Sequence, residues 1–286
     1  MFKSLKHLII LIFILSSYLK SNNIEKITFY DWDKPEINIF YKLPKIITEN
    51  TKVIFIIHGN SRNADGYLDV WTKLAEEYNV LLIAPEFNRA NFSSYNTLMM
   101  ATSSGKIREN QNLYLHNSID ILFDFFIDKY DLDVDQYMLY GHSGGSQFVH
   151  RYLLFSDNPR ISNAVAANAG WYTFLNGASF PYGLNNPPIK LTSDHVRSFL
   201  AMELHILIGS EDVDIDSSVN QSDGANAQGK NRFHRANNFF STTKRIVEEN
   251  NLVFNWKFKI IKGAAHSNTK MSKPAAVILL EDVEKW

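Results

Sequence analysis

Short apolar runs alternate with amphipathic stretches along most of this chain. Residues Lys52 to Ile57 are apolar after the first position and Val80 to Ala84 are apolar throughout, a pattern typical of strands buried on both faces of a sheet. Residues 113–130 instead carry apolar side chains three and four positions apart, which predicts a helix with one buried face. Because strand and helix keep alternating in this way, we expect an α/β fold with a mainly parallel central sheet flanked by helices.

The same periodicities predict the remaining elements. Further strands are expected at residues 24–30, 36–41, 136–140, 162–168, 203–209 and 254–261, and further helices at 67–78, 148–155 and 231–250. Ser272 is expected to cap a last helix, with Pro274 in its first turn. Two long irregular stretches remain at 171–191 and 210–230, and stretches of this length in a compact domain are either functional or mobile.

The composition fits one globular domain over residues 22–286, without a large separate cap domain. The chain has 286 residues, of which 45% are hydrophobic and 21% are charged, so it can bury a substantial core. Its formal net charge of −1 argues against a nucleic-acid partner, and the short basic cluster at 230–235 is expected on the solvated face of a helix. The absence of cysteine excludes disulfides, thiolate catalysis and cysteine-ligated metals.

The first 21 residues differ from the rest and have the pattern of an export signal. Lys3 and Lys6 precede an unbroken apolar run from Leu8 to Leu15, and a serine-containing polar stretch follows it. This run is much shorter than the roughly 20 apolar residues that a membrane-spanning helix needs. We therefore expect a signal peptide over residues 1–21 and a secreted or periplasmic protein. An uncleaved N-terminal anchor, which would be the only expected contact with a membrane, is the alternative.

The hexapeptide Gly141 to Ser146, with the sequence Gly-His-Ser-Gly-Gly-Ser, carries the strongest chemical signal. A strand is expected before it and a helix after it, so Ser143 falls on a sharp turn between the two. Glycines on both sides of a serine permit the strained backbone and the close packing that expose a nucleophilic hydroxyl. We interpret Ser143 as a catalytic nucleophile; an ordinary serine in a glycine-rich turn is the alternative.

A serine nucleophile needs a base, and the base needs an acid that orients it. The last two expected strands end in loops that carry Asp212, Asp214 and Asp216, and then His266. The carboxyl ends of parallel strands meet at one edge of the sheet, where α/β folds bind their ligands. We predict His266 as the base and Asp212 as the acid, with the other two aspartates as its rivals. The spacing of the three aspartates also matches the first ligands of a calcium-binding loop. The glycine and the glutamate that such a loop needs at later positions are missing, so no metal is expected.

Backbone N–H groups must also stabilise the negative charge that develops on the substrate oxygen. Gly144 directly follows the nucleophile and is expected to supply one of these N–H groups. The loop from His58 to Ser61 directly follows the strand expected at 52–57, and Asn60 is expected to supply the second. We interpret His58 itself as a structural histidine that hydrogen-bonds this loop.

These segments together resemble the α/β-hydrolase superfamily over nearly the whole chain after residue 21. The resemblance rests on the His58-Gly59 turn, the Gly141 to Gly145 turn, the Gly-x-x-Asp sequence at Gly209 to Asp212 and the late His266. The stretches 141–152, 168–172 and 227–232 further resemble exported bacterial esterases related to polyhydroxybutyrate depolymerases. The resemblance implies serine-dependent hydrolysis of a small-molecule or polymeric ester, without a cofactor.

The substrate pocket and several alternative functions remain open at this stage. Trp171 and Tyr172 follow the strand expected at 162–168, and they either line an acyl pocket or pack a long loop onto the core. Carboxylic ester hydrolysis is the leading interpretation. Amide cleavage by a serine peptidase, depolymerisation of a polyester and non-catalytic binding on the same fold are the alternatives.

Overall fold

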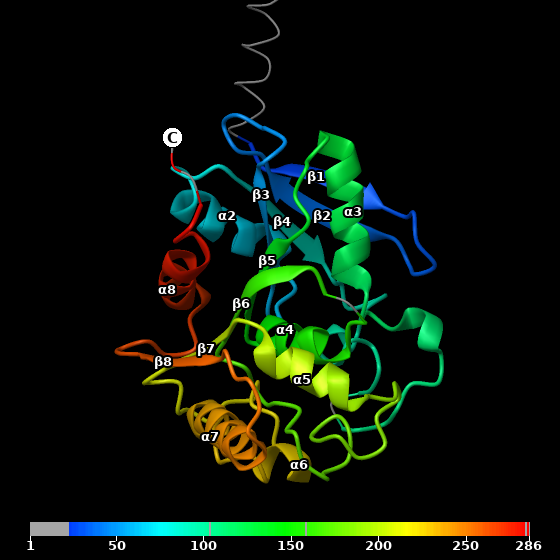
Figure 1. Ribbon diagram of the computed structural model, residues 1–286, viewed down its shortest axis with the longest axis vertical. Helices are drawn as coiled ribbons and strands as arrows, with labels where there is room; N and C mark the ends of the chain where they lie inside the picture. Colours follow the sequence, from blue (N-terminus) through cyan, green and yellow to red (C-terminus); the bar gives the residue numbers. More distant parts are fainter. Residues whose placement is uncertain (1–22, 103, 158, 284, 286) are drawn as a thin grey trace, which may run out of the picture.

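An eight-stranded sheet forms the centre of the computed structural model, which describes residues 23–102, 104–157, 159–283 and 285 (Figure 1). Its strands lie in the order β1 (Glu25–Phe29), β2 (Ile37–Lys42), β4 (Val80–Glu86), β3 (Lys52–Ile57), β5 (Tyr137–His142), β6 (Ile161–Ala167), β7 (Leu204–Gly209) and β8 (Lys257–Ile261). β1 and β2 are antiparallel to their neighbours, whereas all pairs from β4 to β8 are parallel. The mainly parallel α/β fold predicted from the sequence is therefore confirmed.

Helices cover both faces of this sheet. On one face lie α2 (Ala64–Leu74) and α8 (Asn268–Leu279), and on the other α3 (Ser118–Tyr130), α4 (Gly144–Phe155), α5 (Ser193–Ala201) and α7 (Arg232–Asn250) (Figure 1). The long loops hold the short helix α6 (Asp223–Asn226) and two 3₁₀ turns, η1 (Tyr95–Thr97) and η2 (Gln111–Leu113). None of the helices in the described ranges is long and apolar enough to cross a membrane. The expected signal peptide, residues 1–21, lies outside the described part of the chain.

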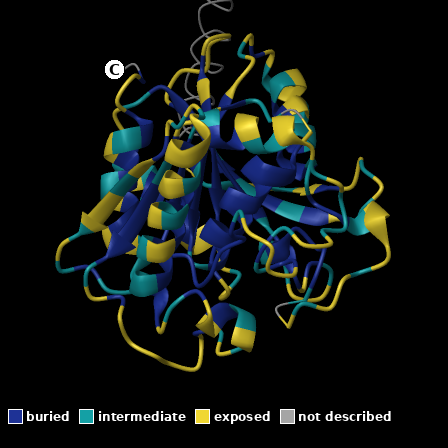
Figure 2. Cartoon of the chain, turned by 60° about the horizontal axis from the view of Figure 1, so that its bottom comes forward, coloured by how far each residue is buried: buried dark blue, intermediate teal, exposed yellow. Residues whose placement is uncertain are grey.

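The central strand β3 shows why the sheet needs helices on both faces. Its side chains from Val53 to Ile57 are all buried, as are most of the neighbouring strands (Figure 2). Because successive side chains of a strand point to opposite faces, Phe55 belongs to the core formed with α3 and α4, whereas Ile54 and Ile56 belong to the core formed with α2 and α8. Each buried side chain of this size contributes about 2 kcal/mol relative to an exposed one, so a polar residue here would destabilise one of the two cores.

The last helix differs from the sequence prediction. It begins before the predicted cap, because the Ser267 hydroxyl accepts a hydrogen bond from a backbone N–H of the first turn at 3.4 Å. Ser272 is instead a buried residue within the helix, and its hydroxyl donates to the Tyr140 hydroxyl at 3.2 Å. Pro274 lies in the middle of the helix and removes one backbone hydrogen bond. Packing of the apolar face of α8 against α2 and the sheet outweighs that loss.

Other elements also differ from the prediction. β8 begins at Lys257 rather than at residue 254, and α3 begins at Ser118, after η2, rather than at 113. The sequence pattern did not predict α5. Its N-terminus is capped by two reciprocal hydrogen bonds between Thr192 and His195. The Thr192 hydroxyl accepts from the His195 N–H at 3.3 Å, and the Thr192 N–H donates to His195 Nδ1 at 3.2 Å. Histidine stands here where glutamate or glutamine usually completes such a cap, so the signal is easily missed.

Candidate active site

Ser143 occupies a sharp turn between β5 and α4. Its backbone angles, φ 59° and ψ −117°, lie outside the helix and strand regions and store strain on the order of 1–3 kcal/mol. A Cβ atom on Gly141 would lie 2.3 Å from the Gly145 carbonyl oxygen, and one on Gly145 would lie 2.0 Å from the Ile57 carbonyl oxygen. Only glycine fits at both positions. The strand, turn and helix expected from the sequence therefore hold the Ser143 side chain at the carboxyl edge of the sheet.

The side chains of Ser143, His266 and Asp212 form one hydrogen-bonded row. Ser143 Oγ lies 2.9 Å from His266 Nε2, and His266 Nδ1 lies 2.8 Å from Asp212 Oδ2. The three residues follow β5, β8 and β7, whose parallel carboxyl ends meet at the same edge of the sheet. In this geometry the serine hydroxyl donates to Nε2, and the Nδ1–H group donates to the carboxylate. The row can therefore pass the serine proton to a neutral imidazole and stabilise the imidazolium that results.

The surroundings of Asp212 distinguish it from its two rivals. Its side chain is 1% exposed, and its Oδ1 atom accepts a hydrogen bond from Arg232 Nη1 at 3.2 Å. Asp214 is exposed, and Asp216 accepts hydrogen bonds from a serine of its own loop. Both carboxylate oxygens of Asp212 are thus engaged by His266 and Arg232, which argues against calcium binding there. In the described ranges, no group of three or more acidic, histidine or cysteine side chains could hold a metal ion.

Asn60 and Gly144 lie next to each other beside the serine. A Cβ atom on Gly144 would lie 2.7 Å from Asn60 Oδ1, and one on Gly59 would lie 3.3 Å from Ser143 Cβ. Gly144 is the first residue of α4, so its N–H group has no acceptor within the helix. The Asn60 carbonyl accepts a hydrogen bond from Arg89 Nη2 at 2.7 Å, which restrains the loop after β3. The structure therefore brings together the two residues that the sequence predicts for the oxyanion site.

His58 is buried behind this loop, and both of its ring nitrogens are engaged. Nε2 accepts a hydrogen bond from the Phe87 N–H at 3.0 Å, so the proton is on Nδ1, which donates to the Gly59 carbonyl at 2.9 Å. Burial lowers the pKa of His58 to about 4. The ring is therefore neutral at physiological pH and joins the loop after β3 to the end of β4. It serves the structure of the loop, as the sequence predicts.

The low pKa of His58 makes the folded state sensitive to acid. An unfolded chain binds a proton on histidine below about pH 6.5, whereas folded His58 resists protonation down to about pH 4. Stability is expected to fall as the pH drops from 6.5 toward 4, by up to about 1.4 kcal/mol per pH unit from this residue. Urea unfolding at pH 7, 6 and 5 should give a shallower decline for His58→Asn than for the wild type. Equal slopes would contradict this origin of the acid sensitivity.

Asn168, which the sequence does not single out, ties the Asp212 and His266 loops together. Its Oδ1 atom accepts from the Gly209 N–H at 2.9 Å, and its Nδ2 atom donates to the Ala265 carbonyl at 3.1 Å. Asn168 is fully buried and adopts the left-handed conformation, with φ 51°. An asparagine at the end of a buried strand is the one signal that could have suggested this role, because asparagine tolerates that conformation.

His142 supports the other side of the His266 ring. The two ring centroids lie 4.8 Å apart, and His142 Nε2 accepts a hydrogen bond from Asn168 Nδ2 at 3.4 Å. Its Nδ1 atom lies 3.0 Å from the Tyr67 hydroxyl. Burial, with the nearby His266 and Arg232 as smaller causes, holds the pKa of His142 well below its usual value. His142 is therefore a neutral packing surface for the half-buried His266 imidazole rather than a second base.

A polar cavity of about 210 Å³ lies beside this site. It is lined by Asn60, Asn96, Gln147, Gly170, Trp171, Ser217, Ser218, Val219 and Asn220. Trp171 is one of these lining residues, which corresponds to the first of the two alternatives that the sequence analysis leaves open. Tyr172 corresponds to the second alternative, packing onto the core, because its side chain is fully buried and its ring stacks on Phe239 of α7, with centroids 4.4 Å apart. Of these two neighbours, only Trp171 lines the cavity.

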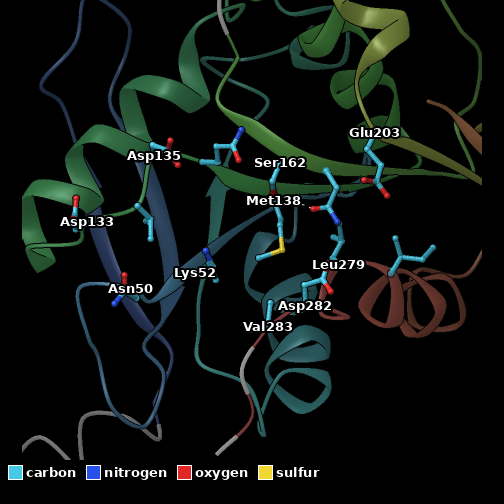
Figure 3. A pocket seen from close by; sticks show the side chains of 14 residues that line it. Asn50, Lys52, Asp133, Asp135, Met138, Ser162, Glu203, Leu279, Asp282 and Val283 are labelled. Carbon is cyan, nitrogen blue, oxygen red and sulfur yellow. Dashed lines mark hydrogen bonds between the residues drawn. The ribbon is translucent and has the colours of Figure 1, made fainter. Parts of the chain in front are cut away.

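A second cavity, of about 360 Å³, lies at the opposite edge of the sheet (Figure 3). Its lining includes Lys52 at the start of β3, Ser162 near the start of β6 and Glu203 just before β7. The length of the strands separates it from Ser143. The residues with reactive geometry therefore gather at the carboxyl edge of the sheet rather than in this cavity.

Solved structures on the same fold match most of the chain. A poly(aspartic acid) hydrolase from Sphingomonas sp. KT-1 is 34% identical, with a TM-score of 0.83 over 90% of this chain and 98% of its own. A poly(3-hydroxybutyrate) depolymerase from Bordetella parapertussis is 27% identical, with a TM-score of 0.82 over 92% of each chain. A siderophore hydrolase from Aspergillus nidulans, 12% identical with a TM-score of 0.58 over 93% of this chain and 97% of its own, shares the fold alone.

No protein-family model matches the sequence, and the comparison with curated proteins finds no match either. The family assignment therefore depends on the solved structures. One of them exceeds 30% identity over nine-tenths of the chain, and these structures carry the fold predicted from the sequence. The chain belongs to the α/β-hydrolase superfamily and is a hydrolase.

Proposed function

We propose that this protein is a serine carboxylic ester hydrolase that works through an acyl-enzyme. The observation that carries the proposal is the unbroken row from Ser143 Oγ through the His266 ring to Asp212, with contacts of 2.9 and 2.8 Å. Such a row activates serine near neutral pH, because the imidazole takes the serine proton while the new bond to carbon forms. A protein that only binds a ligand has no use for this arrangement, which disfavours the non-catalytic alternative.

In the first half-reaction, Ser143 Oγ attacks the ester carbonyl carbon and His266 Nε2 takes the serine proton. The N–H groups of Asn60 and Gly144 donate to the carbonyl oxygen as it becomes negative, and Asp212 stays ionised beside the imidazolium. The bond to the alcohol oxygen then breaks, and the alcohol leaves with the proton from His266. In the second half-reaction His266 takes a proton from water, the hydroxide adds to the acyl carbon, and Ser143 leaves with the proton.

A polymeric substrate is the second candidate, favoured by the names of two relatives. The relative that is 34% identical is a poly(aspartic acid) hydrolase, and the one that is 27% identical is a poly(3-hydroxybutyrate) depolymerase. Both names describe enzymes that cleave a polymer. The same row of side chains would serve an amide or an ester bond, because the tetrahedral intermediate and the proton transfers are alike.

Labelling with a fluorophosphonate tests the proposal directly. The reagent forms a covalent bond only with an activated serine, so one label per chain is expected on the peptide that contains Ser143. The labelled protein should also lose hydrolysis of p-nitrophenyl acetate and p-nitrophenyl butyrate in step with the label. A label elsewhere in the chain, or full activity in the labelled protein, would contradict the proposal.

Asn168→Gly tests whether the two loops must be held together for catalysis. Glycine keeps the left-handed backbone at no steric cost but removes the hydrogen bonds to Gly209 and Ala265. We expect kcat for p-nitrophenyl butyrate to fall by about 10- to 100-fold, because small displacements of a catalytic group carry losses of this size. KM should change little, since Asn168 does not line the cavity beside Ser143.

Asn251→Gly is the matched control for this experiment. Asn251 also has a positive φ, 51°, but it is the exposed residue that ends α7. Its replacement should leave kcat unchanged. If both variants, or neither, lose activity while keeping wild-type circular dichroism, Asn168 has no positioning role.

A further inference from the structure

The cavity beside Ser143 is lined mainly by polar residues, with Trp171 and Val219 as its apolar members, and by no charged side chain. Its amides come from Asn60, Asn96, Gln147 and Asn220, and hydroxyls come from a serine pair at 217–218. Such a lining suits a hydrogen-bonding substituent and does not suit a long aliphatic acyl chain.

Two buried arginines hold the backbone of this lining from behind. Arg151 Nη1 donates to the carbonyls of Asn96 and Gln147, each at 3.0 Å. Arg235 donates from Nη1 to the Gly170 carbonyl and from Nη2 to the Asn220 carbonyl, each at 2.9 Å. All four acceptors belong to residues that line the cavity. The two guanidinium groups therefore contact the backbone of the residues that line the cavity, but they do not line it themselves.

Neither of these two arginines is paired with a carboxylate in the described part of the chain. The Arg151 guanidinium instead stacks on the Trp171 ring, 4.1 Å from its centroid, and is fully buried. Burial lowers the pKa of Arg151 to about 9, which leaves it charged at neutral pH. Arg232 is the third buried arginine of this region, and it alone has acidic partners, Asp212 at 3.2 Å and Asp216 at 3.6 Å.

Three guanidinium groups thus face two carboxylates around one small cavity. Charges in a poorly solvated region are screened weakly, so the excess positive charge acts on whatever occupies the cavity. The cavity is therefore electropositive although its own lining is neutral.

Gln147 offers a hydrogen-bond donor inside this field. Its Oε1 atom accepts from Asn96 Nδ2 at 3.0 Å, which leaves the Nε2 amide hydrogens without an acceptor among the described residues. The Gln147 N–H donates to the Ser143 carbonyl, so the two residues are one helical turn apart, roughly 5–6 Å along α4. A group that reaches Gln147 is therefore only a few bonds away from a carbonyl carbon attacked by Ser143.

The cavity lies on the acyl side of the reaction. Its lining contains Asn60 of the oxyanion site and Gln147 of α4, but no residue of the loop that carries His266. The leaving alcohol must receive its proton from His266, so it departs on the side of that loop. What fills the cavity is then the acyl group.

On these grounds we infer that the cavity selects acyl groups that carry a carboxylate two or three carbons from the scissile carbonyl. The succinyl group of a succinate monoester is an example. This inference rests on the proposed serine hydrolase function. The carboxylate accepts hydrogen bonds from the neutral amides and hydroxyls of the lining. The buried Arg151 and Arg235 supply the compensating charge from behind the wall.

The test compares monoethyl succinate with ethyl levulinate, a neutral ester of nearly the same shape, by titrating the released acid at pH 7.5. We expect kcat/KM for the succinate ester to be higher by about tenfold or more at low salt, and the advantage to shrink in 1 M NaCl. Carboxymethyl butyrate, which carries the charge on the alcohol, should gain no such advantage over ethyl butyrate.

Charge variants then locate the origin of the preference. Gln147→Glu keeps the size of the side chain and adds a negative charge, so it should bring the succinate-to-levulinate ratio below one. Arg235→Met and Arg151→Met should each lower the ratio at least threefold, whereas Arg197→Met, in an exposed ion pair on α5, should leave it unchanged. The ratio is measured within one preparation, so partial misfolding of a variant does not alter it.

Several results would overturn the inference. A succinate-to-levulinate ratio near one in the wild-type protein would contradict the inference without need of any variant. A preference for the ester with the anionic alcohol over the ester with the anionic acyl group would do the same. A high ratio that survives in Gln147→Glu would place the anion elsewhere. If both monoethyl succinate and ethyl levulinate are hydrolysed, but with a kcat/KM ratio near one, the serine hydrolase proposal stands and only this inference fails. No hydrolysis of any of the four esters, with no label on Ser143, would contradict the proposed function itself.

Discussion

Replacing Ser143 with alanine is expected to lower kcat for p-nitrophenyl butyrate by about a millionfold, the scale seen when a triad serine is removed. The reason is that His266 and Asp212 act only through the serine oxygen, so neither retains a function without it. Binding and the oxyanion N–H groups remain, and they should leave a residual rate roughly a thousandfold above that in water. KM should stay within a few fold, because alanine disturbs none of the groups that line the cavity. Progress curves at high enzyme concentration measure both quantities.

Ser146→Ala is the matched control, since it removes a second hydroxyl three residues along the same helix. The Ser146 Oγ atom is buried and has no hydrogen-bond partner among the described residues, so alanine should fold as well as or better than serine. Its activity should equal that of the wild type. Equal hydrolysis by Ser143→Ala and Ser146→Ala would mean that Ser143 does no chemistry, and a non-catalytic binding protein would then be the better interpretation.

The sheet could be predicted because its central strands are buried on both faces. A run such as Val53 to Ile57 has no polar position, and few structures other than an inner parallel strand accept it. Element ends were predicted less well, because they depend on neighbours that the sequence does not reveal. Ser267 rather than Ser272 caps α8, since packing against α2 extends the helix toward His266.

The close approach of Ser143, Asp212 and His266 was predictable, because each lies in a turn or loop that follows a strand whose carboxyl end lies at one edge of the sheet. Asn168 was not, since its partners Gly209 and Ala265 are 41 and 97 residues away and come close only through the order of the strands. Trp171 and Tyr172 show the same limit at the scale of one residue. They are adjacent in the sequence, and only the path of the chain decides which one lines the cavity and which one packs against α7.

Asp212→Asn is expected to lower kcat by about ten-thousandfold. The reason lies in the two oxygens of Asp212. Arg232 can only donate, so the amide oxygen of asparagine should turn to it, and the amide nitrogen should then face His266 Nδ1. That nitrogen can only donate, so Nδ1 must become the acceptor and the ring proton must move to Nε2. A ring in that tautomer cannot take the proton of Ser143, and no carboxylate remains to stabilise an imidazolium.

Asp214→Asn separates this effect from a general loss of negative charge in the loop. Asp214 is exposed and two residues away, so its replacement changes the net charge equally but should alter kcat by less than threefold. The two variants are compared by kcat for p-nitrophenyl butyrate across pH 6–9 and by thermal unfolding. If Asp214→Asn loses activity while Asp212→Asn keeps it, Asp214 rather than Asp212 is the acid that orients His266. If both stay active, the base needs no acid, and the contact of 2.8 Å between Asp212 and His266 serves the fold alone.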